Sequence, residues 1–343
     1  MALVALALAC GRSDIYRYRD AGVVPDAGAA PDAGTDAGVP CTPGTLTLNR
    51  AVPVVMFVLD RSASMRESFG GRSRWSALTE GLAKALPAVD QSIAIGALEF
   101  PGGGSFDACL VNPMVQLAPT RGNVTPLLTL MRNTQPNGAT PTALAIDVGG
   151  SAVRTARAAG SARALVLATD GAPDCNSELD PRRCTCVGGG GLCTATRCLD
   201  DERTVSHIAA QTDAGIPTYV IGIQNAGETA LVRTLNAMAV AGGRPRPGTQ
   251  RYYGVSSQDE LDTALVAIRG QVGACVYLST SVPEDDSKIE IDVAGQPVSF
   301  DPTGAEGWSW SDRRNGELEF HGKACEAVIS AASAVITANV QCE

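Results

Sequence analysis

The chain has 343 residues, of which 45% are hydrophobic and 18% are charged. This composition is that of a globular protein and excludes a wholly disordered chain, and the length suffices for one large domain and one smaller domain. The formal net charge of −9 argues against a nucleic-acid partner, which would require a basic surface.

The chain begins with a short apolar run, residues 1–9, that ends at Cys10 and Gly11. This segment, residues 1–10, resembles a bacterial lipoprotein signal in which Cys10 receives the lipid, although Ala7 stands where leucine is usual. A truncated ordinary signal peptide is the alternative. The run is shorter than the roughly 20 residues that span a bilayer, and no later stretch qualifies. We therefore expect an exported protein, lipid-anchored in the cell envelope at the outer membrane or cell surface, with no other membrane contact.

Residues 11–40 form a segment of low complexity, in which the tripeptide Asp-Ala-Gly recurs between prolines. Such a segment has almost nothing to bury and is predicted to be a solvated linker. At about 3.1 Å per residue in extended form, some thirty residues reach several tens of ångströms. The expected role is to hold the folded part away from a surface.

Residues 41–272 alternate apolar, β-branched runs with helical patterns, which predicts an α/β domain with a mostly parallel, doubly wound sheet. The nearly all-apolar run 52–59 is typical of a central strand that is buried on both faces. The turn at 101–104 predicts that residues 109–117 return antiparallel as an edge strand. Further strands are expected at 93–100, 164–169, 218–223 and 251–255, and helices at 75–86, 141–158, 201–214, 230–241 and 259–268.

The pattern changes after Cys275, where short alternating runs such as residues 288–293 are separated by turn signals such as Asn315-Gly316. Residues 273–343 are therefore predicted to form a small, mainly β module that is stapled by disulfides.

Polar side chains follow two of the predicted strands at the points where these strands end. Asp60, Ser62 and Ser64 follow the central strand, Asp170 follows the strand at 164–169, and Thr140 precedes a predicted helix. In an open α/β sheet, side chains at the carboxyl ends of the strands gather at one edge. Hydroxyl and carboxylate oxygens select hard cations, so we expect a site for Mg²⁺, with Mn²⁺ or Ca²⁺ as alternatives.

These segments, in this order, resemble the metal-ion-dependent adhesion site of von Willebrand factor type A domains and integrin I domains. The resemblance implies that Ser62, Ser64 and Thr140 coordinate the cation directly, while Asp60 and Asp170 act through bound water and hydrogen bonds. It also implies that an aspartate or glutamate of a partner protein completes the coordination. Two alternatives stay open: the serines only turn the chain and cap a helix, or a bound cation only fastens the loops.

Eleven cysteines are present, a number that is typical of an exported protein with disulfides or of a metal-binding protein. Five lie in an insert at 175–198 directly after Asp170, and its Cys-x-Cys spacing lacks the paired Cys-x-x-Cys of a strong zinc signal. We therefore favour disulfides among the ten cysteines other than Cys10, namely Cys41, Cys109, Cys175, Cys184, Cys186, Cys193, Cys198, Cys275, Cys325 and Cys342.

The odd number of cysteines in the insert requires at least one bond to the rest of the chain if all ten are paired. Cys109 is the best candidate, because the hairpin after Phe100 should lie at the same sheet edge as Asp170. Cys41, Cys275, Cys325 and Cys342 would then make two bonds that dock the terminal module.

An enzyme is not expected. His207 and His321 are the only histidines, neither belongs to a recognisable nucleophile–base pair, and phosphate-loop and Gly-x-Ser-x-Gly signatures are absent. A cytosolic ATPase partner is disfavoured by the signal and the cysteines. Two hypotheses remain: an adhesion-type module whose cation captures an acidic side chain, or a structural envelope lipoprotein that the metal and the disulfides only stabilise.

Overall fold

The computed structural model describes residues 39–102, 109–156, 162–187, 193–224, 231–271, 275–330 and 335–342. The signal segment with Cys10 and nearly all of the linker lie outside the described residues, so the expectations for them stay predictions. In the part of the chain that is described, no helix has both the length and the apolar character needed to cross a membrane.

A six-stranded sheet forms the centre of the larger domain, with the strand order β10-β9-β8-β3-β6-β7. The central strand β3 is buried along its whole length and pairs in parallel with β6 and β8. Strand β7 is antiparallel to β6 and forms one edge. The strands are β3 (Val54–Asp60), β6 (Ala94–Phe100), β7 (Leu117–Thr120), β8 (Arg163–Thr169), β9 (Thr218–Ile223) and β10 (Tyr253–Val255). The prediction of a mixed α/β fold around a mostly parallel sheet is confirmed.

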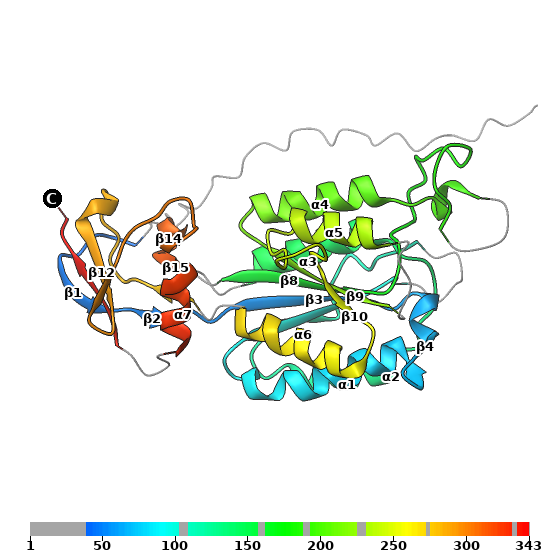
Figure 1. The fold of residues 1–343 in the computed structure, drawn as a ribbon, viewed down its shortest axis with the longest axis horizontal. Helices are drawn as coiled ribbons and strands as arrows, with labels where there is room; N and C mark the ends of the chain where they lie inside the picture. The colour runs from blue at the N-terminus through cyan, green and yellow to red at the C-terminus, as the bar shows by residue number, and fades with distance from the viewer. Residues whose placement is uncertain are drawn as a thin grey trace, which may run out of the picture. The chain divides into compact units, whose positions relative to one another are not determined.

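Helices cover both faces of this sheet (Figure 1). Alternate residues of β3 feed two separate cores: Phe57 packs among side chains of α1, α2 and α6, and Val58 packs among those of α3, α4 and α5. The helices on the first face are α1 (Arg74–Ala85), α2 (Val124–Asn133) and α6 (Gln258–Gln271), and those on the second are α3 (Thr142–Thr155), α4 (Asp201–Asp213) and α5 (Val232–Ala241). A short hairpin, β4 (Ser68–Phe69) and β5 (Arg72–Ser73), leads into α1.

Two local predictions in this domain were wrong. The antiparallel edge strand runs over Leu117–Thr120, whereas we expected it at 109–117; a bend at residues 113 and 114 interrupts that segment. Helix α2 was not predicted, although Val124, Leu127 and Met131 are buried at helical spacing.

The smaller, mainly β module contains two four-stranded sheets, with the orders β1-β16-β12-β13 and β14-β15-β11-β2. Its core includes Trp308, Leu318 and Phe320, which are all fully buried. Its elements are β1 (Gly44–Thr47), β2 (Asn49–Arg50), β11 (Val276–Leu278), β12 (Ile289–Val293), β13 (Gln296–Val298), β14 (Gly307–Asp312), β15 (Glu317–His321), α7 (Gly322–Ser330) and β16 (Ile336–Val340).

The boundary of the larger domain differs from the one expected at Cys41. Strands β1 and β2 pair with β16 and β11, so residues 44–50 belong to the terminal module. The module is therefore built from both ends of the described chain. This pairing joins segments more than two hundred residues apart, and nothing in the local pattern of residues 44–50 signals it.

Five disulfides pair the ten cysteines of the described residues. Cys109 bonds to Cys175, the link between the insert and the sheet edge that the odd cysteine count predicted. The other bonds are Cys184–Cys198 and Cys186–Cys193 within the insert, and Cys41–Cys342 and Cys275–Cys325 in the terminal module.

Candidate metal centre

The five candidate ligands lie at the carboxyl edge of the sheet. Asp60 ends β3, Ser62 and Ser64 follow it in the turn that contains the 3₁₀ helix η1 (Ala63–Arg66), and Asp170 follows β8. The hydroxyl oxygens of Ser62 and Ser64 are 3.0 Å apart, and the Ser64 hydroxyl donates to Asp170 Oδ1 at 2.8 Å. Thr140 precedes α3, and its loop is joined to the serine turn by the hydrogen bond from Ala63 N to the carbonyl of Gly138. The structure therefore brings the predicted groups together.

Asp60 is fully buried and orients the serine turn. Its Oδ1 accepts from the backbone N–H of Ser62, and its Oδ2 accepts from the hydroxyl of Thr169, both at 2.7 Å. Burial, with a smaller contribution from the charge of Asp170, raises the pKa of Asp60 to about 7, against the lowering effect of these hydrogen bonds. The carboxyl group is thus fixed in position, and a positive charge nearby would favour its ionised form.

Asp170 is held on both of its carboxylate oxygens. Ser64 donates to Oδ1, and the buried guanidinium of Arg74 donates from Nη1 to Oδ2 at 2.8 Å. Burial raises the pKa of Asp170, and the hydrogen bond and charge of Arg74 oppose that rise. Arg74 was not a candidate from the sequence, because an arginine in the first turn of a helix gives no sign that it is buried.

Thr140 is fixed through its backbone. Its N–H donates to Asp174 Oδ1 at 2.7 Å, and the N–H of Asp174 donates back to the Thr140 carbonyl at 3.0 Å. Asp174 was also missed by sequence reasoning; burial raises its pKa to about 6. The side-chain hydroxyl of Thr140 makes no hydrogen bond to any described residue, although Thr140 is only 6% exposed. This oxygen is not among the buried side-chain atoms that lack a partner, so it is accessible to solvent and available to a ligand.

The donor set fits a hard divalent cation. Three hydroxyls and two carboxylates offer only oxygen, and the Thr140 hydroxyl is left unpartnered where such a cation would bind. Ser62, Ser64 and Thr140 are the groups that would hold it directly, with Asp60 and Asp170 behind them. The two histidines lie elsewhere: His207 is paired with Asp147, and His321 with Ser309.

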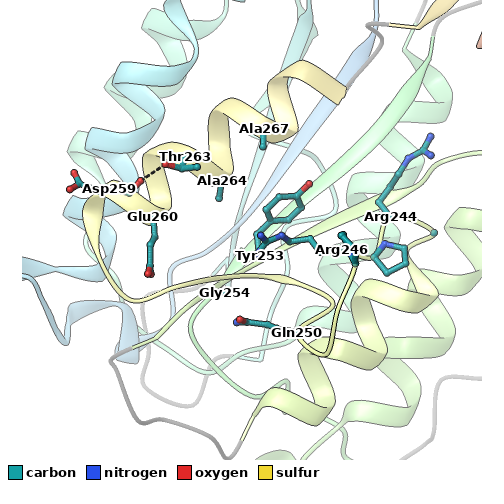
Figure 2. Close-up of a pocket in the computed structure, with 13 residues that line it drawn as sticks. Arg244, Arg246, Gln250, Tyr253, Gly254, Asp259, Glu260, Thr263, Ala264 and Ala267 are labelled. Carbon is teal, nitrogen blue, oxygen red and sulfur yellow. Dashed lines mark hydrogen bonds between the residues drawn. The ribbon is translucent and has the colours of Figure 1, made fainter. Parts of the chain in front are cut away.

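Two other features of the described residues resemble binding sites. The sulfurs of Cys184, Cys193 and Cys198 lie within 4.8 Å of one another, but they belong to two disulfides and offer no thiolate. A cavity of about 720 Å³ lies between α6 and the chain that precedes β10 (Figure 2). Three of its charged side chains have partners: Arg246 stacks over Tyr253, Arg244 pairs with Glu319, and Glu260 accepts hydrogen bonds from Ser256.

Residues 55–172 match the family profile of the von Willebrand factor type A domain, and this span contains all five candidate ligands. No curated protein sequence matches the chain.

Several solved structures are similar to the chain. The pilus adhesin SpaC from Lactobacillus rhamnosus GG is 14% identical, with a TM-score of 0.48 over 88% of this chain and 42% of that one. The chain thus spans less than half the length of that adhesin. The PilB minor pilin from Streptococcus sanguinis is 19% identical, with a TM-score of 0.45 over 66% of this chain and 62% of that one. The manganese-loaded Plasmodium vivax TRAP protein is 17% identical, with a TM-score of 0.41 over 66% and 78%.

Proposed function

We propose that the chain is an exported, non-enzymatic binding protein of the cell envelope, anchored through a lipid on Cys10. Its larger domain captures an aspartate or glutamate side chain of a partner protein through a divalent cation, Mg²⁺ in the first place and Mn²⁺ or Ca²⁺ as alternatives. The observation that carries this proposal is the Thr140 hydroxyl, which has no partner among the described residues and belongs to the same edge as Ser62 and Ser64. The family match over residues 55–172 supports it.

The side chains of the site have two roles: some would bind the cation, and others hold those ligands in position. Ser62, Ser64 and Thr140 supply neutral oxygens, so they bind a cation without cancelling its charge. The carboxylates of Asp60 and Asp170 accept hydrogen bonds that fix the serine turn, and the carboxylate of Asp174 fixes the backbone of Thr140. When bound, the cation supplies an electrophilic centre that attracts a carboxylate. The partner's acidic side chain then provides the negative charge that the direct ligands lack.

A second candidate function is favoured by the five disulfides. In this alternative the chain is a structural envelope lipoprotein, and the cation and the disulfides only stabilise the scaffold. Unlike the first function, this one involves no partner protein whose binding requires the cation.

The two functions are separated by an affinity experiment on cell-surface extracts, performed with Mg²⁺ and again with EDTA. We expect the immobilised chain to retain a partner protein with Mg²⁺ and to lose it with EDTA. The Asp60→Ala variant should not retain this partner even with Mg²⁺. The exposed Asp213 at the end of α4 supplies the control, and Asp213→Ala should retain the partner. If Asp60→Ala instead lowers the melting temperature strongly and no partner depends on Mg²⁺, the structural alternative holds.

A further inference from the structure

Arg74 occupies a position that is unfavourable for a cationic side chain. It is the first residue of α1 and is only 2% exposed. The N-terminus of a helix carries a partial positive charge, and burial removes the guanidinium from water, so both effects oppose an arginine here. A charge in such a place requires close negative partners.

The negative partners of Arg74 differ in their exposure. Arg74 Nη1 is 2.8 Å from Asp170 Oδ2, whose side chain is fully buried, and 3.0 Å from Glu67 Oε2, whose side chain is 58% exposed. The backbone N–H of Arg74 also donates to the Glu67 carbonyl at 3.0 Å. Because water screens the pair with Glu67, the buried carboxylate of Asp170 is the main electrostatic partner.

The charge of the centre follows from these contacts. Asp60 and Asp170 together carry two negative charges when ionised, and Arg74 returns one positive charge. Asp174 and Glu67 lie nearby and add negative charge in either case, so the effect of Arg74 is to make the loaded centre one unit more positive than it would be without this residue. A more positive centre holds its cation less tightly, and it attracts a carboxylate more strongly.

We propose that Arg74 is a positioning and specificity-determining residue that weakens the hold of the centre on its cation and strengthens its attraction for an incoming carboxylate. This inference rests on the proposed function. By linkage, a carboxylate that binds the loaded centre must raise the affinity for the cation by the same factor. Arg74 increases this factor.

The test measures Mn²⁺ binding to the full chain by isothermal titration calorimetry at pH 8, without and with saturating acetate. Acetate binding to free Mn²⁺ is measured separately and subtracted. In the native protein acetate should lower the Kd for Mn²⁺. In Arg74→Met the Kd without acetate should fall about ten-fold or more, the scale for one charge a few ångströms from a partly screened ion. The acetate effect, meaning the fold-decrease of the Mn²⁺ Kd on adding acetate, should nearly disappear in Arg74→Met. Arg74→Lys should retain most of it.

Glu67→Gln tests the same inference with a substitution at an exposed side chain. It removes a negative charge beside Arg74, so Mn²⁺ binding should weaken about two-fold at low ionic strength and the acetate effect should grow. This variant decides the question if Arg74→Met does not fold. If the acetate effect is unchanged in Arg74→Met, the role of Arg74 is overturned. If Arg74→Met does not fold, an unchanged acetate effect in Glu67→Gln overturns it. Failure of the native protein to bind Mn²⁺ overturns the proposed function itself.

Discussion

At the scale of single residues, the buried carboxyl groups make cation binding depend on pH. Burial raises the pKa of Asp60 to about 7, and a cation nearby favours the ionised form and so lowers that pKa. Cation binding therefore releases protons below about pH 7. We expect the affinity for Mn²⁺ to fall about ten-fold for each pH unit below 7 and to level off above it, as measured by calorimetric titration between pH 5.5 and 8.5. Asp60→Asn should remove most of this slope, and a flat profile in the native protein would contradict the prediction.

The same groups set how the stability of the cation-free protein varies with pH. The folded-state pKa of Asp60 is about 7 and that of Asp174 about 6, both above the ordinary value of 3.8, because burial disfavours the charge. The folded state therefore binds more protons between about pH 4 and pH 7, and its stability falls as the pH rises through this range. Thermal melts in EDTA should give a lower melting temperature at pH 7.5 than at pH 5. Saturating Mn²⁺ should reduce or reverse the difference, and a higher melting temperature at pH 7.5 in EDTA would contradict this sign.

Residues that belong to a motif could be predicted from the sequence, and residues that support the motif could not. Asp60, Ser62 and Ser64 lie within five positions after an apolar strand, so their type and order indicate an oxygen site. Arg74 and Asp174 act through contacts with residues far away in the chain, Asp170 and Thr140. Their burial and their partners appear only in the folded chain.

At the scale of elements, the Cys109–Cys175 disulfide links the edge of the sheet to the insert. Cys175 adopts a left-handed φ of 74°, unusual for a residue other than glycine, and follows Asp174, which fixes the backbone of Thr140. Replacing both cysteines by serine should lower the stability by about 2–4 kcal/mol, because the bond closes a long loop. It should also weaken Mn²⁺ binding, since the backbone that presents the Thr140 hydroxyl loses support.

The disulfide Cys186–Cys193 provides the matched control, because it lies within the insert and spans only seven positions. Its removal should leave the affinity for Mn²⁺ unchanged in calorimetric titrations. The single variant Cys109→Ser should expose one free thiol, on Cys175, which mass spectrometry after alkylation detects. Equal losses of Mn²⁺ affinity in the two double variants would show that the insert acts only through general stability.

The elements were predicted where a local pattern specifies them. The central strand was predicted because the run 52–59 is nearly all apolar, and β9 was predicted at its observed bounds. The assignment of β1 and β2 to the terminal module was not predicted, because their partners β16 and β11 lie at the other end of the chain. Pairing over such a distance depends on the complete fold, which local periodicity does not contain.

At the scale of the whole molecule, the larger domain is inserted between the two chain segments of the terminal module. The Cys41–Cys342 disulfide joins these segments across 301 positions. An ion pair between Arg244, after α5, and Glu319 in β15 links the two domains at 3.2 Å. The module therefore depends on residues that precede the larger domain, and the larger domain builds its sheet without them.

This arrangement predicts that the module can be weakened separately. Replacing both Cys41 and Cys342 by serine frees the first strands to separate from β16, and a loop of this length makes the loss as large as about 5 kcal/mol. Tryptophan fluorescence can follow the module alone in a Trp75→Phe background, since the remaining Trp308 and Trp310 lie in β14. As urea is added, the tryptophan fluorescence should change at a lower concentration than the far-ultraviolet circular dichroism of the helices. Mn²⁺ should shift only the transition seen by circular dichroism. A single coincident transition that Mn²⁺ shifts as a whole would show instead that the two domains unfold together.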